Sequence, residues 1–320
     1  AYTALHGVGT SLVERVLAAA GFAAPRVVPE QAEPDPDFPT VAFPNPEEPG
    51  ALDLALRLAA EISADIVLAN DPDADRCAVA VASEGSWRVL RGDEVGVLLA
   101  DTLLRRGTEG VYATTIVSSS LLERMARDSA ADYAETLTGF KWLARVPGLT
   151  FGYEEALGYC IAPELVRDKD GISALLLLAE VAAELKSQRR TLLDRLDELA
   201  ERYGVYATDS LSIRVDDVAV IAVAMQRLRG AQPHQLGGLR VEHVDDLSYG
   251  SASLPPTEGL RYRLADGGRV VVRPSGTEPK LKAYLEVVVP VSSSGVRAAR
   301  DQAAGRLAAV RTDLAAALSI

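Results

Sequence analysis

The sequence predicts a multi-domain α/β protein in which two mixed α/β sheet domains are followed by a smaller α+β domain. The chain has 320 residues, more than one hydrophobic core usually organises. Over the first two thirds, short β-branched runs alternate with helical patterns. Around Gly204 the composition shifts towards closely spaced strands. We therefore expect domains at residues 1–88, 89–204 and 205–320.

The first domain opens with a strand end and a glycine-containing turn, and its middle is rich in proline. Eight prolines between residues 25 and 50 exclude a regular helix there, because each lacks an N–H group and restricts the residue before it. The expected elements are a turn at 2–9, a helix at 11–20, an irregular loop at 25–50, a helix at 51–63, and a strand, tight turn and strand around 66–81.

The second domain continues the alternation of strands and helices. We expect Asp93 to be the N-cap of its first helix and Ser118–Ser120 to cap the next one. The alternative for the serines is a nucleophile, which is disfavoured because no histidine or lysine base neighbours them in sequence. The expected elements are a strand at 87–90, a helix at 91–107, a strand at 110–117, a helix at 121–128, a polar turn at 135–142, a glycine-bounded loop at 151–159, a turn at 168–171, a long buried helix after it, and a helix at 192–203.

The third domain reads as strands with helices on one face. The expected elements are strands at 209–215, 239–244, 260–264, 269–272 and 280–289, helices at 218–228 and 295–318, and an irregular excursion at 248–259.

Charge and composition exclude several classes of function. The net charge of −12 and the pI near 4.9 argue against nucleic-acid and anionic-membrane partners, which require a positive field. The longest apolar stretch, 172–185, is interrupted by Glu180 and Glu184 and is too short for a membrane span. Two cysteines are too few for a disulfide framework, so we expect a reducing, cytoplasmic location.

Three aspartates at alternate positions form the strongest local signal. Asp71, Asp73 and Asp75 lie between two apolar runs, and carboxylate oxygens are the ligands that Mg²⁺ prefers. Arg76 follows directly and can hold an anion beside the metal. The pattern is not an EF-hand, because Arg76 and Ala82 occupy the positions where that loop needs glycine and glutamate. The alternative is an acidic surface turn without an ion.

A second signal is RPSGTEPK at 273–280, which has the composition of a phosphate-binding loop. Arg273 offers a forked cation, Ser275 and Thr277 offer hydroxyl groups, and Gly276 allows close approach of backbone N–H groups to an anion. An ordinary serine-glycine turn is the alternative.

Five further polar residues could act at a binding site. Lys141 and Lys169 could each contact an anion or remain solvated, and His6 could face a ligand or be a solvated or capping residue. Glu154 and Glu155 are adjacent, so their side chains point in different directions and at most one should grip a sugar hydroxyl while the other is structural.

Taken together and in order, DPDADR, TLTGFK, EEALGY, RDKDG and RPSGTEPK resemble the motifs of the α-D-phosphohexomutase superfamily, which includes phosphoglucomutase and phosphomannomutase. The resemblance covers nearly the whole chain. YTALHGVG, FPNPEEPGAL and TGFKW resemble more closely the branch with phosphopentomutase-like and glucose-1,6-bisphosphate synthase-like members. Family members have four domains around a cleft, and this chain matches the last three.

The resemblance implies a role for each motif. Asp71, Asp73 and Asp75 would hold Mg²⁺, with Arg76 at the transferring phosphoryl group and Lys141 as acid or base. The implied sugar contacts are Thr138, Gly139, Glu154, Glu155 and Lys169, and the implied phosphate contacts are Arg273, Ser275, Gly276 and Thr277. Ala156 departs from the serine of many relatives, which removes one hydroxyl contact and leaves the hexose selectivity open.

The resemblance also implies a reaction. A phosphoserine gives its phosphoryl group to a hexose monophosphate, the hexose 1,6-bisphosphate turns round, and the other phosphate returns to serine. No serine of this chain has the Ser-His-Asn-Pro type of context, so we expect the chain to lack the phosphoserine domain and to be inactive alone. The alternatives are a non-catalytic phosphosugar-binding module, a hexose-bisphosphate synthase and a phosphopentomutase.

Overall fold

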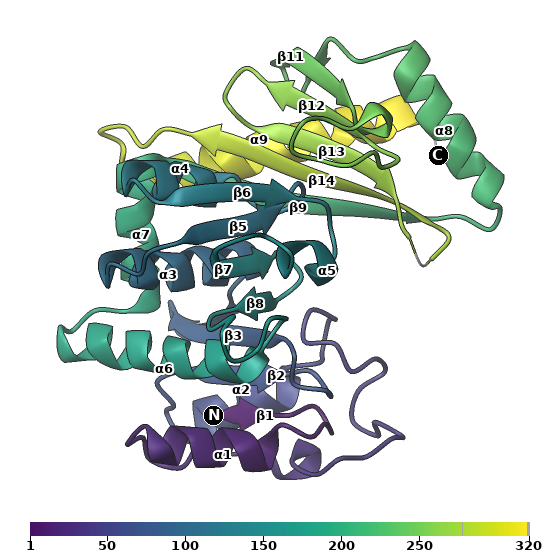
Figure 1. Ribbon diagram of the computed structural model, residues 1–320. Helices are drawn as coiled ribbons and strands as arrows, with labels where there is room; N and C mark the ends of the chain where they lie inside the picture. The colour runs from purple at the N-terminus through teal and green to yellow at the C-terminus, as the bar shows by residue number, and fades with distance from the viewer. Residues whose placement is uncertain (277, 319–320) are drawn as a thin grey trace. The chain divides into compact units, whose positions relative to one another are not determined.

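A computed structural model describes residues 1–276 and 278–318, which form two compact units (Figure 1). The first unit consists of Ala1–Ser118, Leu122–Ala134 and Thr138–Leu196, and the second of Ser119–Leu121, Glu135–Leu137 and the described residues from Asp197 onward. Helices and sheets are mixed in both units, so the multi-domain α/β fold predicted from the sequence is confirmed.

The first unit begins with a mixed sheet in the order β1-β2-β3-β4. Its strands are β1 (Tyr2–Thr3), β2 (Val67–Asn70), β3 (Cys77–Ser83) and β4 (Ser86–Val89). β1 is parallel to β2, whereas β3 is antiparallel to both of its neighbours. β2 is buried along its whole length, as expected for a strand covered on both faces.

The helices that pack on this sheet or beside it include α1 (Thr10–Ala19), α2 (Asp53–Glu61) and α6 (Gly171–Ser187). α1 packs against α6, and α6 also packs on β2 and β3. Asp170 caps α6, since its Oδ1 atom accepts hydrogen bonds from the N–H groups of Ile172 and Ser173. The proline-rich segment at 25–50 is irregular apart from the short 3₁₀ helix η1 (Pro29–Gln31), as predicted.

The first unit contains most of a second sheet, in the order β6-β5-β7-β8. Its strands are β5 (Val111–Thr115), β6 (Asp132–Thr136), β7 (Leu149–Glu154) and β8 (Gly158–Cys160). β5 is parallel to β7, and β7 is antiparallel to β8. The helices of this part are α3 (Gly92–Arg105), α4 (Leu121–Asp128), α5 (Phe140–Leu143) and α7 (Leu192–Tyr203), of which α7 runs on into the second unit.

Three local predictions in this region are wrong. Residues 151–159 are not a loop but form most of the β7–β8 hairpin. The glycines in this stretch favoured the prediction of a loop. Residues 135–142 are not a continuous turn, because β6 and α5 occupy both of its ends. Asp93 is not the N-cap of α3; it lies inside the first turn, buried, and accepts a hydrogen bond from the Tyr153 hydroxyl group at 3.1 Å.

The N-terminus of α3 packs backbone against backbone on the β7–β8 hairpin. The N-cap is Arg91, whose N–H group donates to the Glu94 carboxylate at 2.9 Å. A Cβ atom on Gly92 would lie 1.8 Å from the Glu155 carbonyl oxygen, so only glycine fits there. This contact fixes the position of the hairpin relative to α3.

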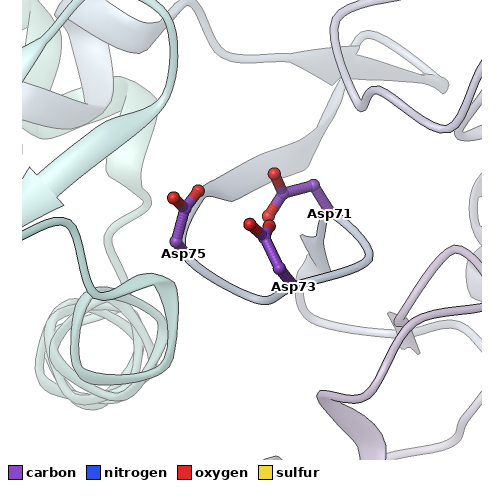
Figure 2. Close-up of side chains that lie close together, drawn as sticks. All are labelled: Asp71, Asp73 and Asp75. Atoms are coloured by element: carbon purple, nitrogen blue, oxygen red, sulfur yellow. The ribbon is translucent and has the colours of Figure 1, made fainter. Parts of the chain in front are cut away.

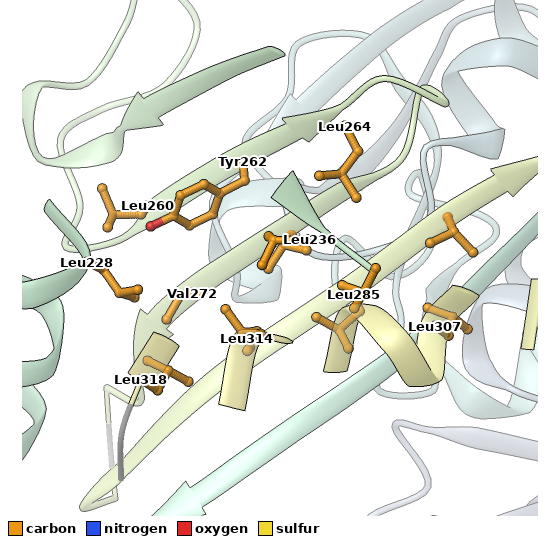
Figure 3. Close-up of a cluster of buried hydrophobic side chains, with 14 of the residues drawn as sticks. Leu228, Leu236, Leu260, Tyr262, Leu264, Val272, Leu285, Leu307, Leu314 and Leu318 are labelled. Carbon is orange, nitrogen blue, oxygen red and sulfur yellow. The ribbon is translucent and has the colours of Figure 1, made fainter. Parts of the chain in front are cut away.

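The second unit is built on an antiparallel sheet in the order β10-β11-β12-β13-β14-β9. Its strands are β9 (Val205–Arg214), β10 (Gln235–Leu236), β11 (Leu239–Asp246), β12 (Leu260–Leu264), β13 (Arg269–Pro274) and β14 (Lys280–Val289). The helices are α8 (Val218–Gly230), α9 (Gly295–Leu318) and the 3₁₀ helix η2 (Leu247–Tyr249). Leu228, Tyr262, Leu285 and Leu314 illustrate the core between this sheet and both helices (Figure 3).

Ion pairs of one glutamate and hydrogen bonds to another attach two short segments to this sheet. The Glu135 carboxylate accepts hydrogen bonds from Nη1 of Arg261 and Nη1 of Arg269, each at 2.6 Å. Glu286, which is buried, accepts hydrogen bonds from the hydroxyl groups of Ser119 and Ser120. Residues 119–121 and 135–137 therefore belong to the second unit although their neighbours in sequence belong to the first.

Membrane insertion through a helix is not supported within residues 1–276 and 278–318, where every helix is too short or too polar to cross a bilayer. Cys77 and Cys160 are both buried thiols.

Candidate metal and phosphosugar site

The predicted metal loop is the turn between β2 and β3. Figure 2 shows the side chains of Asp71, Asp73 and Asp75 around this turn, and one carboxylate oxygen from each lies within 4.8 Å of the others. The turn closes through a hydrogen bond from the Ala74 N–H group to the Asp71 carbonyl oxygen at 2.9 Å, and Ala74 has φ of 58°. Asp71 is buried, Asp75 is half-buried and Asp73 is exposed.

The donor set fits Mg²⁺. Oxygen ligands at about 2.1 Å from an octahedral ion are about 3.0 Å apart when neighbouring and about 4.2 Å apart when opposite. The three carboxylates therefore need only small side-chain rotations, and Asp73 is exposed enough to make one. Since three carboxylates so close together repel one another, a divalent cation would relieve the repulsion.

Asp71 and Arg76 form a close ion pair inside the loop. Nε of Arg76 donates to Oδ2 of Asp71 at 2.5 Å, and the Arg76 backbone N–H group donates to Oδ1 at 3.0 Å. Burial raises the pKa of Asp71 above its usual value, although Arg76 opposes this effect. Nη1 of Arg76 donates to Oδ1 of Asn45 at 3.0 Å. Within the described part of the chain, this leaves the Nη2 edge of Arg76 without a partner, and that edge could meet a phosphate oxygen.

Asn45 is a contact that the sequence alone did not identify. It lies within the proline-rich segment, 31 residues before the arginine that it contacts. Its position between two prolines in FPNPEEP restricts its backbone, but no local pattern places its side chain beside Arg76.

Lys169 joins the metal loop to the sugar-binding motif. Its Nζ atom lies 2.9 Å from Oδ2 of Asp75 and 5.5 Å from the centroid of the Phe140 ring. Burial would lower the pKa of Lys169, but the hydrogen bond and the charge of Asp75 outweigh burial and raise it. The lysine is therefore a cation at neutral pH, placed beside the carboxylates of the loop.

The backbone at the start of α6 also supports this arrangement. The Gly171 N–H group donates to the Ala74 carbonyl oxygen at 3.2 Å, and a Cβ atom on Gly171 would lie 2.2 Å from the Arg76 carbonyl oxygen. Arg76 also pairs with Gly158, the first residue of β8. The metal loop, the β7–β8 hairpin and the start of α6 are thus joined by backbone contacts.

The predicted sugar-binding residues Gly139 and Glu154 lie together. The Gly139 N–H group donates to Oε1 of Glu154 at 2.7 Å, and Gly139 has φ of 107°, which favours glycine. Burial raises the pKa of Glu154, while the Gly139 hydrogen bond and the charge of Lys169 oppose the rise. Thr138, directly before this contact, is half-buried.

Glu155 has a different environment from Glu154. Its Oε2 atom accepts a hydrogen bond from the Ser118 hydroxyl group at 2.8 Å, and Ser118 also contacts the Thr115 hydroxyl group at 2.9 Å. Burial and the nearby charge of Asp93 raise the pKa of Glu155 to about 7. The sequence argument that adjacent carboxylates point in different directions therefore holds for this pair.

Two other predicted residues are less closely associated with the loop. Lys141 is exposed on α5, and its Nζ atom lies 5.9 Å from the centroid of the Trp142 ring. His6 is buried, which excludes the solvated alternative, and its Nε2 atom lies 2.7 Å from the Thr40 hydroxyl oxygen.

The predicted phosphate loop connects β13 to β14 in the second unit. The Ser275 N–H group donates to the Lys280 carbonyl oxygen at 2.8 Å and closes the base of the loop. A Cβ atom on Gly276 would meet nothing within 4 Å, so this glycine leaves one side of the loop open. Arg273 has no ion pair with any residue that the structure describes, whereas Lys280 pairs with Glu278 at 2.8 Å. Thr277 lies outside the described residues.

Family models for three consecutive domains match the chain. They are "Phosphoglucomutase/phosphomannomutase, alpha/beta/alpha domain II" at residues 1–85, the corresponding domain III at residues 91–203, and the C-terminal domain at residues 211–302.

Curated relatives are similar over most of this chain. A Haemophilus influenzae protein named "Probable phosphomannomutase" is 46% identical over 289 residues, which is 89% of this chain and 59% of the relative. The phosphopentomutase of Homo sapiens is 36% identical over 92% of this chain and 54% of its own length. The chain thus spans between one half and two thirds of these relatives.

Solved structures share the fold at low sequence identity. The phosphoglucomutase pp63/parafusin from Paramecium has a TM-score of 0.73 at 20% identity, over 99% of this chain and 57% of that one. A phosphoglucomutase/phosphomannomutase family protein from Burkholderia thailandensis has a TM-score of 0.67 at 20% identity, over 99% of this chain and 60% of that one.

Proposed function

The chain belongs to the phosphoglucomutase/phosphomannomutase family, and we propose that the whole protein is a phosphosugar mutase that interconverts a hexose 1-phosphate and a hexose 6-phosphate. The observation that carries this proposal is that Asp71, Asp73 and Asp75 lie together with Arg76 and Lys169, which form ion pairs with two of them. Such a set of carboxylates and cations suits phosphoryl transfer, in which the protein mainly positions groups and neutralises charge.

Each side chain has a task in this proposal. Mg²⁺, when bound to the three aspartates, would neutralise charge on the transferring phosphoryl group. Arg76 would direct its Nη2 edge to a phosphoryl oxygen, while Asp71 and Asn45 hold the rest of the guanidinium. Lys169 would contact the same group or the reacting hydroxyl. Glu154, held by Gly139, would accept hydrogen bonds from sugar hydroxyl groups.

The loop at 273–280 would bind the phosphate that is not transferred. Arg273 supplies a forked cation, and the open side of Gly276 admits an anion to the backbone. Because the bisphosphate intermediate turns round between the two transfers, this loop would receive each phosphate in turn.

We also propose that this chain needs a phosphoserine from elsewhere in the whole protein. None of its own serines lies in the sequence context of the family nucleophile, so the chain alone would bind ligand without turnover. The proposed cofactors are Mg²⁺ and hexose 1,6-bisphosphate, and the proposed location is the cytoplasm.

A pentose phosphate is the second candidate substrate. The similarity to phosphopentomutase over 92% of this chain favours it. Ala156 follows the two glutamates where a serine hydroxyl would offer another contact, and a smaller sugar would not need that contact.

Phosphorus NMR of the whole gene product tests both candidates. The protein is mixed with Mg²⁺, a trace of hexose 1,6-bisphosphate and either glucose 1-phosphate, mannose 1-phosphate or ribose 1-phosphate. We expect conversion of at least one hexose 1-phosphate to the 6-phosphate. Conversion of ribose 1-phosphate alone would establish the pentose reaction instead, and no conversion of any of them would refute the mutase proposal.

A further inference from the structure

A strained turn precedes α1. The Gly7 N–H group donates to the Ala4 carbonyl oxygen at 2.8 Å, and the two central residues, Leu5 and His6, have φ of 48° and 61°. Positive φ at both central positions is typical of a type I′ turn, which usually contains asparagine and glycine. Histidine is tolerated in this conformation but leucine rarely adopts it, so other contacts must hold Leu5 and the turn in place.

The residues after this turn lie directly against the metal loop. A Cβ atom on Gly7 would lie 2.2 Å from the Cα atom of Pro72, and the Val8 N–H group donates to the Pro72 carbonyl oxygen at 2.9 Å. A Cβ atom on Gly9 would lie 3.3 Å from the Cβ atom of Ala74. Pro72 and Ala74 alternate with the three aspartates, so residues 7–9 support the backbone that carries the carboxylates.

The proline-rich segment holds the strained turn through two side chains. The backbone N–H group of His6 donates to the backbone carbonyl oxygen of Gln31 at 3.1 Å. In the side chain, Nε2 of His6 shares a hydrogen bond of 2.7 Å with Oγ1 of Thr40. Nε2 of Gln31 donates to the same Thr40 oxygen at 2.8 Å, and Oε1 of Gln31 accepts from the Thr3 hydroxyl group at 2.6 Å. Gln31 and His6 are buried, so the Thr3–Gln31 bond is shielded from water, whereas the two bonds to Thr40 are partly buried.

We infer that His6, Gln31 and Thr40 are positioning residues for the metal loop, acting through Gly7 and Pro72. The inference rests on the proposed metal-binding role of Asp71, Asp73 and Asp75. Three mutually repelling carboxylates keep a binding geometry only if their backbone is fixed before the ion arrives. Without the support, the loop must lose conformational entropy when it binds, and the affinity for the ion falls.

Thr40→Val tests this role in the full chain. Thr40 is exposed, so valine fits there without disturbing a core, but it removes the hydroxyl group that His6 and Gln31 share. Thr312→Val is the matched control, since Thr312 is also exposed and its hydroxyl group donates to the Ala308 carbonyl oxygen of α9 in the second unit. The probe is Mn²⁺, and electron paramagnetic resonance measures the unbound ion, with Mg²⁺ as competitor.

We expect Thr40→Val to weaken Mn²⁺ binding by about tenfold, the lower end of the loss seen when outer partners of metal ligands are removed. Thr312→Val should bind as the unchanged chain does. Gly7→Ala, whose methyl group must displace Pro72, should weaken binding further. If Thr40→Val bound Mn²⁺ with an affinity within twofold of that of the unchanged chain, the inference would be overturned, while the proposed metal site would stand. Failure of the unchanged chain to bind Mn²⁺ would overturn the proposed metal site as well.

Discussion

Ser118 and Glu155 hold each other through two hydrogen bonds. The Ser118 hydroxyl group donates to Oε2 of Glu155 at 2.8 Å, and the Glu155 N–H group donates to the Ser118 hydroxyl oxygen at 3.1 Å. This pair joins the segment after β5 to the turn after β7, next to Glu154. The Glu155 carboxyl group is therefore hydrogen-bonded to Ser118, whereas the neighbouring Glu154 accepts a hydrogen bond from the Gly139 N–H group and lies near the charge of Lys169.

Stability of the first unit should depend on pH through Glu155. Its pKa is raised to about 7 in the folded state, mainly by burial, from an ordinary value near 4.5. Because the pKa is higher in the folded state, the protonated carboxyl group of Glu155 stabilises the fold, fully so below about pH 4.5. This contribution to stability is lost as the pH rises through about 7. Allowing for solvent screening at a half-buried group, the loss is about 2 kcal/mol. Glu155→Gln should therefore gain stability relative to the unchanged chain between pH 5 and pH 8.

Tryptophan fluorescence during thermal unfolding measures this effect, since both tryptophans, Trp87 and Trp142, lie in the first unit. Glu61→Gln, at the exposed end of α2, is the control and should show no such change. An equal difference between Glu155→Gln and the unchanged chain at pH 5 and pH 8 would contradict the assignment.

Lys169 should compete with the metal for Asp75. The ammonium group lies 2.9 Å from Oδ2 of Asp75, so replacing it removes a cation from the site. Lys169→Met should raise the Mn²⁺ affinity of the chain by about fivefold, which corresponds to about 1 kcal/mol of repulsion. Lys186→Met is the control, because Lys186 pairs with the exposed Asp65 instead. Weaker Mn²⁺ binding by Lys169→Met would show that the lysine supports the loop rather than competing with the ion.

Two glycine substitutions should have opposite effects on stability. A Cβ atom on Gly92 would lie 1.8 Å from the Glu155 carbonyl oxygen, so Gly92→Ala should cost more than about 2 kcal/mol. Gly305 lies inside α9 with open space around its Cα atom, so Gly305→Ala should stabilise the chain by about 0.5 to 1 kcal/mol. Urea unfolding followed by circular dichroism measures both, and a tolerated alanine at Gly92 would show that α3 can move away from the hairpin.

The ion pairs of Glu135 should stabilise the second unit. Burial disfavours the charge of Glu135, but Arg269 and Arg261 outweigh it and hold the pKa below its usual value. Glu135→Ala leaves buried arginine charge without this partner and should cost about 2 kcal/mol. Glu123→Ala, which breaks an exposed pair with Arg127, should cost less than about 0.5 kcal/mol. Equal losses for the two variants in urea unfolding would contradict the role of burial.

Elements with strong periodicity were predictable from the sequence. The ranges 121–128, 192–203, 280–289 and 295–318 coincide with α4, α7, β14 and α9. The β7–β8 hairpin was missed because Gly152, Gly158 and two adjacent glutamates resemble a loop. A Cβ atom on Gly158 would lie 2.6 Å from Cδ of Lys169, so a larger residue there would have to shift the lysine side chain. No local pattern contains that information.

Part of the candidate site was likewise predictable from the sequence, and part was not. The spacing of Asp71, Asp73 and Asp75 predicts a shared loop because neighbouring positions of one turn must lie close together. By contrast, the contact of Lys169 with Asp75 spans 94 residues and that of Asn45 with Arg76 spans 31, and both depend on how the elements pack. The surroundings of His6 were not predictable either, because His6 contacts Gln31 and Thr40, which lie far from it in sequence, in a segment that is irregular apart from η1.

The most direct test of the proposed function is a mutase assay of the whole gene product with Mg²⁺, comparing the unchanged protein with Asp73→Ala. Asp73 is the exposed member of the three aspartates, so alanine should leave the fold intact. Asp132→Ala, at the exposed start of β6, is the control. We predict that Asp73→Ala loses at least about a hundredfold in kcat with unchanged thermal stability, as expected for a lost metal ligand. Full activity of Asp73→Ala with Mg²⁺ present would contradict the metal assignment on which the proposed function depends.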